Sequence, residues 1–417
     1  MIQHISTIAE RFVIFFNRHR FMAAFGIMLI SSILLLPETN SEMRGDVVVF
    51  QGIANDLVHG TLPYRDRVVE YPPYAIPIFL LPRLFGEGNY LDGFLTLAFI
   101  ADWLIKISLF AMGLRQSKTA RALLPLLLYC VAVPCIHFFL LQRYDLWPAL
   151  VCLLAVWLFG SGRYTASGLA IAVGIGVKLY PILFVPPLLV LAWRQGQWKP
   201  FSTGLVLGLL PLGCLSFYLP WWRFAEFHAA RGLQVESLYA SGLWLGHLLG
   251  FAEIHWTYTN KWYEVQGAAA TTVLPWARLI FVAGVGGSTV ISMWAAAKLQ
   301  RVSVPQIARL LLISLLAFVG LNQVFSPQYM IWLLPLAALA SVEGKLWPPC
   351  AIALATAFTP WFYPVPDYYG PGLNGLESLV LFGRDWLVIA VWISLLLETW
   401  RRSSRLEPKA ASPLATR

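Results

Sequence analysis

The residues best suited to chemistry are concentrated in one acidic stretch near the start of the chain. Six of the 21 acidic residues lie between Glu38 and Tyr74, after the first long apolar run. Within this stretch Asp46 directly precedes another apolar run, where a helix N-cap is also expected. The two roles are compatible, because a capping position fixes the direction of the carboxylate. A carboxylate held near a dry pocket can take a proton from a hydroxyl group, and we expect Asp46 to be such a general base.

Two more carboxylates, Asp66 and Glu70, are expected to shape a cleft or to orient an acceptor molecule. Asp66 lies between Arg65 and Arg67, so a local ion network is an equally good interpretation of it. Prolines follow Glu70 and stiffen the segment, which suits the floor of a binding cleft.

Three basic residues are candidates for binding a phosphate. Lys178 is the only charged residue in the segment 164–193, and a lone lysine between apolar runs needs an anionic partner or water. Arg143 and Arg231 could join it, because arginine binds phosphate bidentately whereas lysine acts as a compact charge. The alternative for Arg143 is an ordinary polar turn, 142–145, between two spans.

Polar residues of two later segments complete the candidate site. Gln234 and Glu236, in the segment 231–237, offer hydrogen-bond donors and acceptors and are expected to shape the cleft or to orient the acceptor molecule, with solvation at the surface as the alternative. Gln328 and Tyr329 follow a Ser-Pro pair at the start of an apolar run. We expect them to help bind the phosphate, with a simple helix break as the alternative.

The composition indicates how these residues are positioned. The chain has 417 residues, of which 58% are hydrophobic and 12% charged, and long apolar runs recur along it, as in polytopic helical membrane proteins. The net charge of +9 comes from short basic clusters between these runs, a pattern typical of cytoplasmic loops. We therefore expect no nucleic-acid partner. The five cysteines have neither metal-site spacing nor the pattern of a disulfide framework.

The positions of the basic clusters predict the topology. With the N-terminus inside, an odd number of apolar segments precedes Arg194 and Lys199, which should also be inside. One segment therefore does not cross, and the proline-broken stretch 71–85 suits a re-entrant or surface-lying segment. About 12 crossings remain, with both termini inside; the expected spans are 21–36, 91–114, 122–141, 146–159, 165–177, 179–193, 201–220, 275–297, 307–325, 329–341, 346–362 and 376–397.

We thus predict an all-α, multi-pass protein of the cytoplasmic membrane, with membrane lipids around it. A cytoplasmic N-terminal segment, 1–20, precedes a single transmembrane domain, 21–397, and a cytoplasmic tail, 398–417, follows. Outer loops are expected at 38–74, 221–274 and 364–375, and the first of them should carry juxtamembrane helices. No Walker loop, dinucleotide turn, HExxH motif or nucleophile elbow occurs in the sequence.

Several of these motifs occur in the order found in one known family. The chain resembles the GT-C glycosyltransferases of the group that contains the bacterial polyprenol-phosphate-mannose-dependent α-mannosyltransferases (family GT87). The resemblance extends over about residues 20–397. It is carried by Asp46 after the first span, the turn 60–63 running into Tyr71-Pro72-Pro73, Lys178-Leu179-Tyr180-Pro181, and Ser326-Pro327-Gln328-Tyr329 with Trp332 and Pro335.

The resemblance implies a GT-C-like fold, an active site open to the extracytoplasmic side, and a polyprenyl-phosphate sugar as donor. No metal and no cofactor are expected, and the acceptor would be a glycolipid or cell-envelope glycan. The acid matching Asp46 deprotonates the acceptor hydroxyl, which attacks the anomeric carbon with inversion, while Lys178 and Arg231 match regions near the donor phosphate. Many family members have histidines where this chain has Gln328-Tyr329, so a hexose is implied without fixing it as mannose.

Two other classes of function compete with this one. A transporter or flippase of lipid-linked sugars would need polar groups near the bilayer midplane, where only Asp102 and Lys106 are expected. These two residues are four apart on a helix and can pair with each other, which favours a structural role. A non-catalytic membrane scaffold would have no use for so many polar residues on one face.

Overall fold

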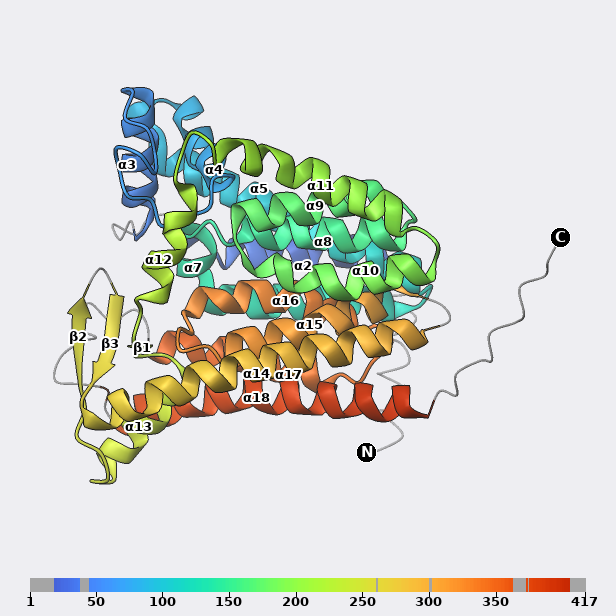
Figure 1. The fold of residues 1–417 in the computed structure, drawn as a ribbon. Coiled ribbons are helices and arrows are strands. Elements are labelled where there is room, and N and C mark those ends of the chain that lie inside the picture. Colours follow the sequence, from blue (N-terminus) through green and yellow to red (C-terminus); the bar gives the residue numbers. More distant parts are fainter. Residues whose placement is uncertain are drawn as a thin grey trace.

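The computed structural model describes residues 19–37, 45–259, 262–299, 302–362, 373 and 375–405 (Figure 1). Most of the predicted N-terminal segment, part of the first outer loop, most of the loop 364–375 and much of the tail therefore lie outside the described residues. The last helix extends to Ser404, beyond the predicted end of the final span at residue 397.

Most of the described chain is a bundle of helices that run side by side (Figure 1). Each predicted span contains at least one of these helices. They are α2 (Arg20–Ile33), α5 (Tyr90–Gln116), α6 (Leu124–Ala132), α7 (His137–Gln142), α8 (Leu146–Gly160), α9 (Tyr164–Val177), α10 (Val185–Arg194), α11 (Trp198–Leu215), α14 (Ala268–Lys298), α15 (Val304–Gly320), α16 (Met330–Ala340), α17 (Trp347–Phe358) and α18 (Gly375–Ser404).

Short 3-10 helices extend several of these elements or link them. With these extensions, five helices in the described residues are long and apolar enough to cross a membrane, which identifies a helical membrane protein. The five are Glu87–Gln116, Ala120–Gln142, Trp198–Leu215, Ala268–Lys298 and Gly375–Ser404.

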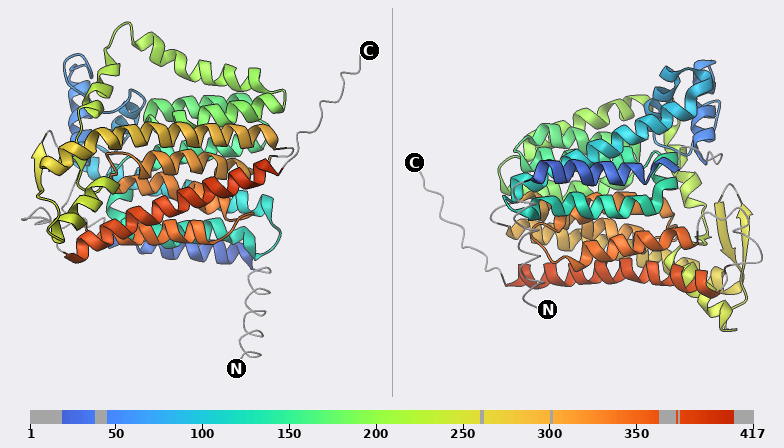
Figure 2. Two further views of the ribbon diagram at one scale, coloured as in Figure 1. Left: turned by 60° about the horizontal axis from the view of Figure 1, so that its bottom comes forward. Right: turned by 180° about the vertical axis from the view of Figure 1, so that it is seen from behind.

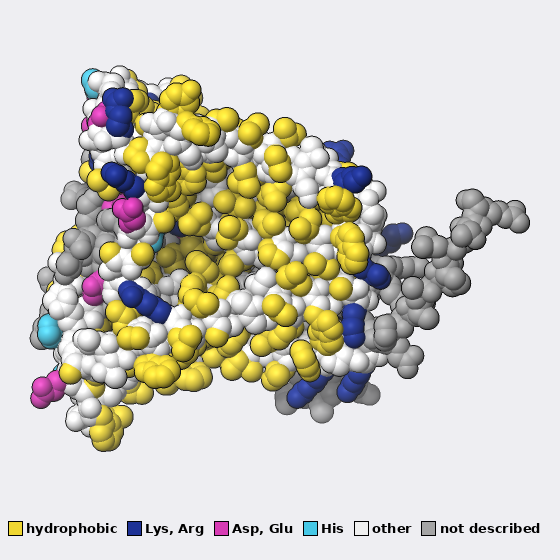
Figure 3. All heavy atoms as spheres, viewed as in Figure 1, with side chains coloured by type: hydrophobic (Ala, Val, Ile, Leu, Met, Phe, Trp, Pro, Cys, Tyr) yellow, Lys and Arg dark blue, Asp and Glu magenta, His cyan; other side chains and the backbone are white. Residues whose placement is uncertain are grey.

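The two ends of the bundle differ in charge. Figure 3 shows an apolar flank, with Asp and Glu at the end where α3 (Val47–Val58) lies and many Lys and Arg at the opposite end. Arg115, Arg194 and Arg401 lie in the last turns of α5, α10 and α18. We call the end where α3 lies the cavity end, and the end where these arginines lie the basic end.

Helix α3 runs across the cavity end instead of along the bundle (Figures 1 and 2). An aromatic cluster attaches it: Phe50 stacks on Phe79 with ring centroids 4.3 Å apart and contacts Tyr144 edge-on at 5.6 Å. Phe79 belongs to the predicted non-crossing stretch 71–85, which folds as the short helices α4 (Ala75–Leu80) and η2 (Leu81–Phe85). The Tyr74 hydroxyl fixes this stretch to α11 by donating to the Gly208 carbonyl at 2.7 Å.

The predicted outer loop 221–274 is an ordered cap. It contains η7 (Trp221–Arg223), α12 (Phe224–Ala229), α13 (Leu238–Leu248) and a three-stranded antiparallel sheet of order β1-β3-β2. The strands are β1 (Leu233–Gln234), β2 (His255–Thr259) and β3 (Trp262–Gln266). This sheet was not predicted, although the aromatic and β-branched residues of β2 and β3 favour strands.

Small residues let α9 and α11 pack backbone to backbone. A Cβ atom at Gly204 would lie 1.8 Å from the Thr165 carbonyl oxygen, and one at Gly168 would lie 2.1 Å from the Phe201 carbonyl oxygen. Glycine at such positions is what close helix packing in membranes requires. Tyr74 contacts both helices, since its backbone N–H donates to the Gly176 carbonyl of α9 at 2.9 Å and its hydroxyl donates to the Gly208 carbonyl of α11.

We therefore expect Gly204→Ala to destabilise the protein by about 1–3 kcal/mol, because the added methyl group forces the two backbones apart. Gly213→Ala, in the same helix, is the matched control, since nothing lies within 4 Å of a Cβ there. Thermal unfolding in detergent should show a lower Tm for Gly204→Ala only. Equal Tm values for the two variants would show that the α9–α11 contact is not this close.

Candidate active site

A cavity of about 1030 Å³ opens at the cavity end. It is lined by the start of α3, the turn before α8, the segment between α9 and α10, the cap 221–274, and the segment between α15 and α16. The sequence-predicted site residues that line it are Asp46, Glu70, Arg143, Lys178, Arg231, Gln234, Glu236, Gln328 and Tyr329.

Asp66 is the predicted site residue that does not line the cavity. Its carboxylate pairs with Arg65 at 2.9 Å and accepts from the Leu62 backbone N–H at 2.9 Å. These contacts hold the pKa of Asp66 below its usual value. Asp66 thus takes part in the local ion network of a turn, and Arg67 pairs separately with Asp56.

Asp46 occupies the N-cap position of α3, but its side chain makes no capping hydrogen bond. The preceding Gly45 has a φ of +47°, a conformation that glycine adopts without strain. This turn directs the carboxylate into the cavity, where Asp46 forms an ion pair with Arg143. Arg143 comes from the turn between α7 and α8, so the base candidate and a phosphate-binding candidate neutralise each other in this state.

Lys178 is held by a carboxylate and two aromatic rings. Its ammonium lies 2.5 Å from Asp145 Oδ1, 4.7 Å from the Tyr144 ring centroid and 4.9 Å from that of Trp332. Asp145 is 1% exposed and also accepts from Trp332 Nε1 at 2.7 Å. Burial lowers the pKa of Lys178, and the Asp145 carboxylate opposes this shift.

A third pair connects the cap to the segment before α4. Arg231 Nη2 is 3.9 Å from Glu70 Oε2, and both side chains are 17% exposed. The Arg231 carbonyl accepts from Gln323 at 2.6 Å and from Arg278 at 3.2 Å. These bonds connect the cap to α14 and to the segment after α15, and they fix the position of the Arg231 backbone.

Glu236 joins the cavity to a buried charge cluster on α18. Arg384 is fully buried, donates to the Glu236 carbonyl and pairs with Asp385 at 2.7 Å. Its guanidinium lies over the rings of Phe325 at 4.0 Å and Phe362 at 4.7 Å. Burial raises the pKa of Glu236 to about 7, although Arg384 opposes the shift.

Aromatic rings form the wall beside Lys178. Tyr329 stacks on Trp332 with centroids 4.0 Å apart, and Trp332 stacks on Tyr180 at 4.4 Å. Gln328 accepts a hydrogen bond from the Ser326 hydroxyl at 2.5 Å. Stacked rings next to polar groups are a surface on which a sugar ring can lie, with its hydroxyl groups toward the polar side.

The cavity also reaches the lipid-facing flank. Leu179, Ile182 and Val282 line it and are 41%, 53% and 66% exposed. Leu179 and Ile182 belong to the segment before α10, whereas Val282 lies on α14, and the flank carrying these helices is hollowed there (Figure 3). A charged chamber therefore continues into an apolar side opening.

Sequence reasoning missed several residues of this site. Asp145 was treated as part of a polar turn, and the Arg384–Asp385 pair was not singled out. A signal existed for that pair, because two adjacent charges inside the apolar run 376–397 are unusual. The predicted Asp102–Lys106 pair is confirmed at 2.6 Å, and neither residue lines the cavity.

No family model matches the chain, and no curated protein matches it.

The raised pKa of Glu236 predicts a pH-dependent stability. Between about 4.5, its ordinary value, and about 7, the folded protein holds a proton that the unfolded chain has lost, so rising pH lowers the free energy of unfolding. Glu236→Gln removes this effect. We expect the Tm of the variant minus that of the wild type to increase as the pH rises through this window and to level off above it. A difference that does not change with pH would contradict the assignment.

Proposed function

We propose that the protein is a GT-C-like glycosyltransferase that transfers a mannose-like hexose from a polyprenyl-phosphate donor to a lipid-linked or cell-envelope glycan acceptor. The observation that carries the proposal is the continuity of the cavity. Its chamber holds carboxylates and cations, and its side opening is apolar. Such a shape fits a substrate whose head is a phosphorylated sugar and whose tail is hydrocarbon dissolved in the bilayer.

The charges in the chamber suit the two halves of the reaction. Lys178 and Arg231, with Arg143, provide positive charge for the donor phosphate and for the negative charge that develops on it as it leaves. Asp46 is the general base. The stacked rings of Tyr329 and Trp332 support the sugar, and Gln234, Glu236 and Glu70 offer polar partners to sugar and acceptor hydroxyls.

The reaction is a single displacement. The acceptor hydroxyl oxygen attacks the anomeric carbon while its proton moves to the Asp46 carboxylate. The bond between the anomeric carbon and the phosphate oxygen breaks, and its electron pair leaves with polyprenyl phosphate. Attack opposite to the leaving group inverts the configuration. This chemistry draws on the donor's own phosphate ester and needs no nucleotide.

Arg143 links donor binding to the availability of the base. Without substrate its guanidinium neutralises Asp46, and a paired carboxylate is a weaker base. A phosphate entering beside Lys178 competes for the same guanidinium. Asp46 then becomes available to the acceptor hydroxyl when the donor is in place, which limits transfer of the sugar to water.

The proposed orientation has 12 crossings, the cavity end outside and both termini in the cytoplasm of a bacterium. It is supported by the Lys and Arg residues gathered at the basic end (Figure 3), since such residues are retained on the cytoplasmic side. A flippase would need polar groups leading from one end to the other. The deep pair Asp102–Lys106 is instead sealed, with both side chains 0% exposed.

Asp46→Asn tests the catalytic proposal. Purified protein is incubated with polyprenyl-phospho-hexoses and a panel of membrane glycolipids, and release of polyprenyl phosphate is measured. Loss of a general base should lower turnover by about 100-fold to 10,000-fold. Asp66→Asn is the matched control, because this carboxylate lies in the same segment but outside the cavity. Full turnover by Asp46→Asn with saturating acceptor would reject the base assignment.

The orientation is tested with single cysteines. Two residues are replaced separately by Cys. Val48 is 53% exposed on α3, at the cavity end. Ser161 is exposed and follows the last residue of α8, whose first residue lies next to the cavity. A membrane-impermeant thiol reagent should modify Val48→Cys in intact cells and Ser161→Cys only after permeabilisation. The native chain gives the background from Cys214 and Cys350, which are exposed. The reverse pattern of labelling would show that the cavity end faces the cytoplasm.

A further inference from the structure

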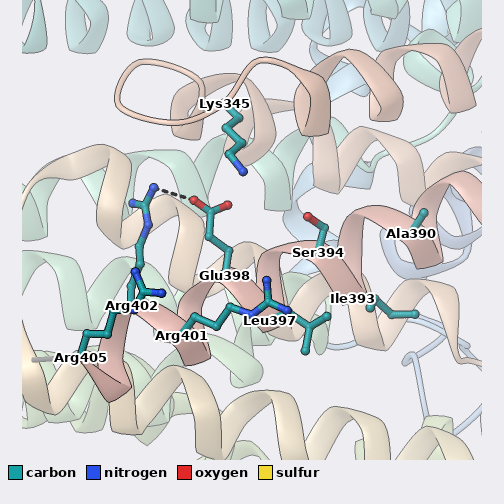
Figure 4. A pocket seen from close by; sticks show the side chains of 9 residues that line it. All are labelled: Lys345, Ala390, Ile393, Ser394, Leu397, Glu398, Arg401, Arg402 and Arg405. Atoms are coloured by element: carbon teal, nitrogen blue, oxygen red, sulfur yellow. Dashed lines mark ion pairs between the residues drawn. The ribbon is translucent and has the colours of Figure 1, made fainter.

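A second pocket, of about 710 Å³, lies at the basic end, away from the candidate active site (Figure 4). The last turns of α18 and the connection between α16 and α17 form it. Its walls are of two kinds: Ala390, Ile393 and Leu397 are apolar, whereas Lys345, Arg401, Arg402 and Arg405 are cationic.

Positive charge exceeds negative charge in this pocket. Its four cations face one carboxylate, Glu398, and Figure 4 shows Arg402 paired with it. Glu398 accepts from Arg402 at 2.6 Å and from Arg309 at 3.0 Å, so two arginines already share it. Within the part of the chain that the structure describes, the side chains of Lys345 and Arg401 form no hydrogen bond or close ion pair, although Lys345 also interacts electrostatically with Glu398. Because Glu398 is already shared by Arg309 and Arg402, it does not balance the charges of Lys345 and Arg401, which can attract an external anion.

The apolar wall shows where that anion would come from. Ile393 is 40% exposed and Leu397 46% exposed, one helical turn apart on the same face of α18. In a membrane protein such a face contacts acyl chains. The cations follow it at the end of the helix, at the depth where lipid headgroups lie. Leu346 and Trp347, next to Lys345 in the sequence, are 47% and 40% exposed, as in an interfacial belt.

We infer that this pocket binds one acidic phospholipid, with its phosphodiester on Lys345 and Arg401 and an acyl chain along Ile393 and Leu397. Arginine is well suited to the phosphate oxygens, because its planar fork can donate two parallel hydrogen bonds. The pair formed by Glu398 and Arg309 orients the last turns of α18, which keeps the cationic side chains over the apolar face. The inference is independent of the proposed catalytic activity.

The competing explanation is that these cations act only as topology signals. Basic residues on other connections at the same end serve for comparison. Arg194 and Lys199 are exposed and belong to neither pocket. If general surface charge were responsible for lipid binding, neutralising Arg194 and Lys199 should weaken it as much as neutralising Lys345 and Arg401.

The full-length protein is purified with mixed lipids and analysed by native mass spectrometry after exchange with phosphatidylglycerol or phosphatidylcholine. We expect the wild type to retain one phosphatidylglycerol in preference to phosphatidylcholine. Lys345→Gln with Arg401→Gln should weaken this retention about tenfold or more. Arg194→Gln with Lys199→Gln should leave it unchanged, although the net charge falls equally. Leu397→Asn, which keeps every charge, should weaken it as well.

Three results would overturn the inference. Retention could be the same in Lys345→Gln/Arg401→Gln as in the wild type, or it could fall equally in the comparison pair. Millimolar inorganic phosphate could also displace the bound lipid, which would make the site one for a free anion. Should the double variant not fold, Lys345→Gln alone and Leu397→Asn carry the same expectation, and unaltered retention in both would count against it.

Discussion

Charge neutralisation inside an apolar bundle is the constraint on which the candidate site depends. Three carboxylate–cation pairs border one cavity: Asp46 with Arg143, Asp145 with Lys178, and Glu70 with Arg231. An isolated charge is costly where water is scarce, and a counter-charge offsets much of that cost. Each pair also joins segments that are far apart in the sequence. The electrostatic requirement thus brings together α3, the turn before α8, the segment after α9 and the cap.

In the proposed reaction, the same pairs keep the site ordered and leave it open to the donor. A carboxylate held by an arginine is fixed in position without filling the cavity, and a phosphate can compete for that arginine. Lys178 differs, because the buried Asp145 and the rings of Tyr144 and Trp332 hold it from three sides. We regard Lys178 as the stationary charge of the chamber and Arg143 as the exchangeable one.

Local signals made part of this arrangement predictable from the sequence. Apolar runs gave the helices, and lone polar residues next to them, such as Asp46 and Lys178, indicated the cavity because burial makes charge rare there. Which carboxylate pairs with which cation is decided by the tertiary structure, however. In the sequence Asp145 resembles an ordinary turn residue, because its partner Lys178 is 33 residues away. Asp66 illustrates the opposite case, because its ion-pair partner is the adjacent residue Arg65 and can be predicted from the sequence. The small sheet of the cap was missed because β2 and β3 are only five residues each, and their aromatic and β-branched residues are a weaker signal than a long apolar run.

For the proposed polyprenyl-phosphate donor, the side opening at Leu179, Ile182 and Val282 makes concentration in the bilayer the relevant quantity. A ligand that arrives through this opening diffuses in two dimensions, within one leaflet, and its encounter rate depends on its mole fraction among the lipids. Adding bulk lipid to a reconstituted sample then dilutes the substrate even when its amount per volume is constant. The fluidity of the surrounding bilayer becomes a kinetic variable, alongside the chemistry of the chamber.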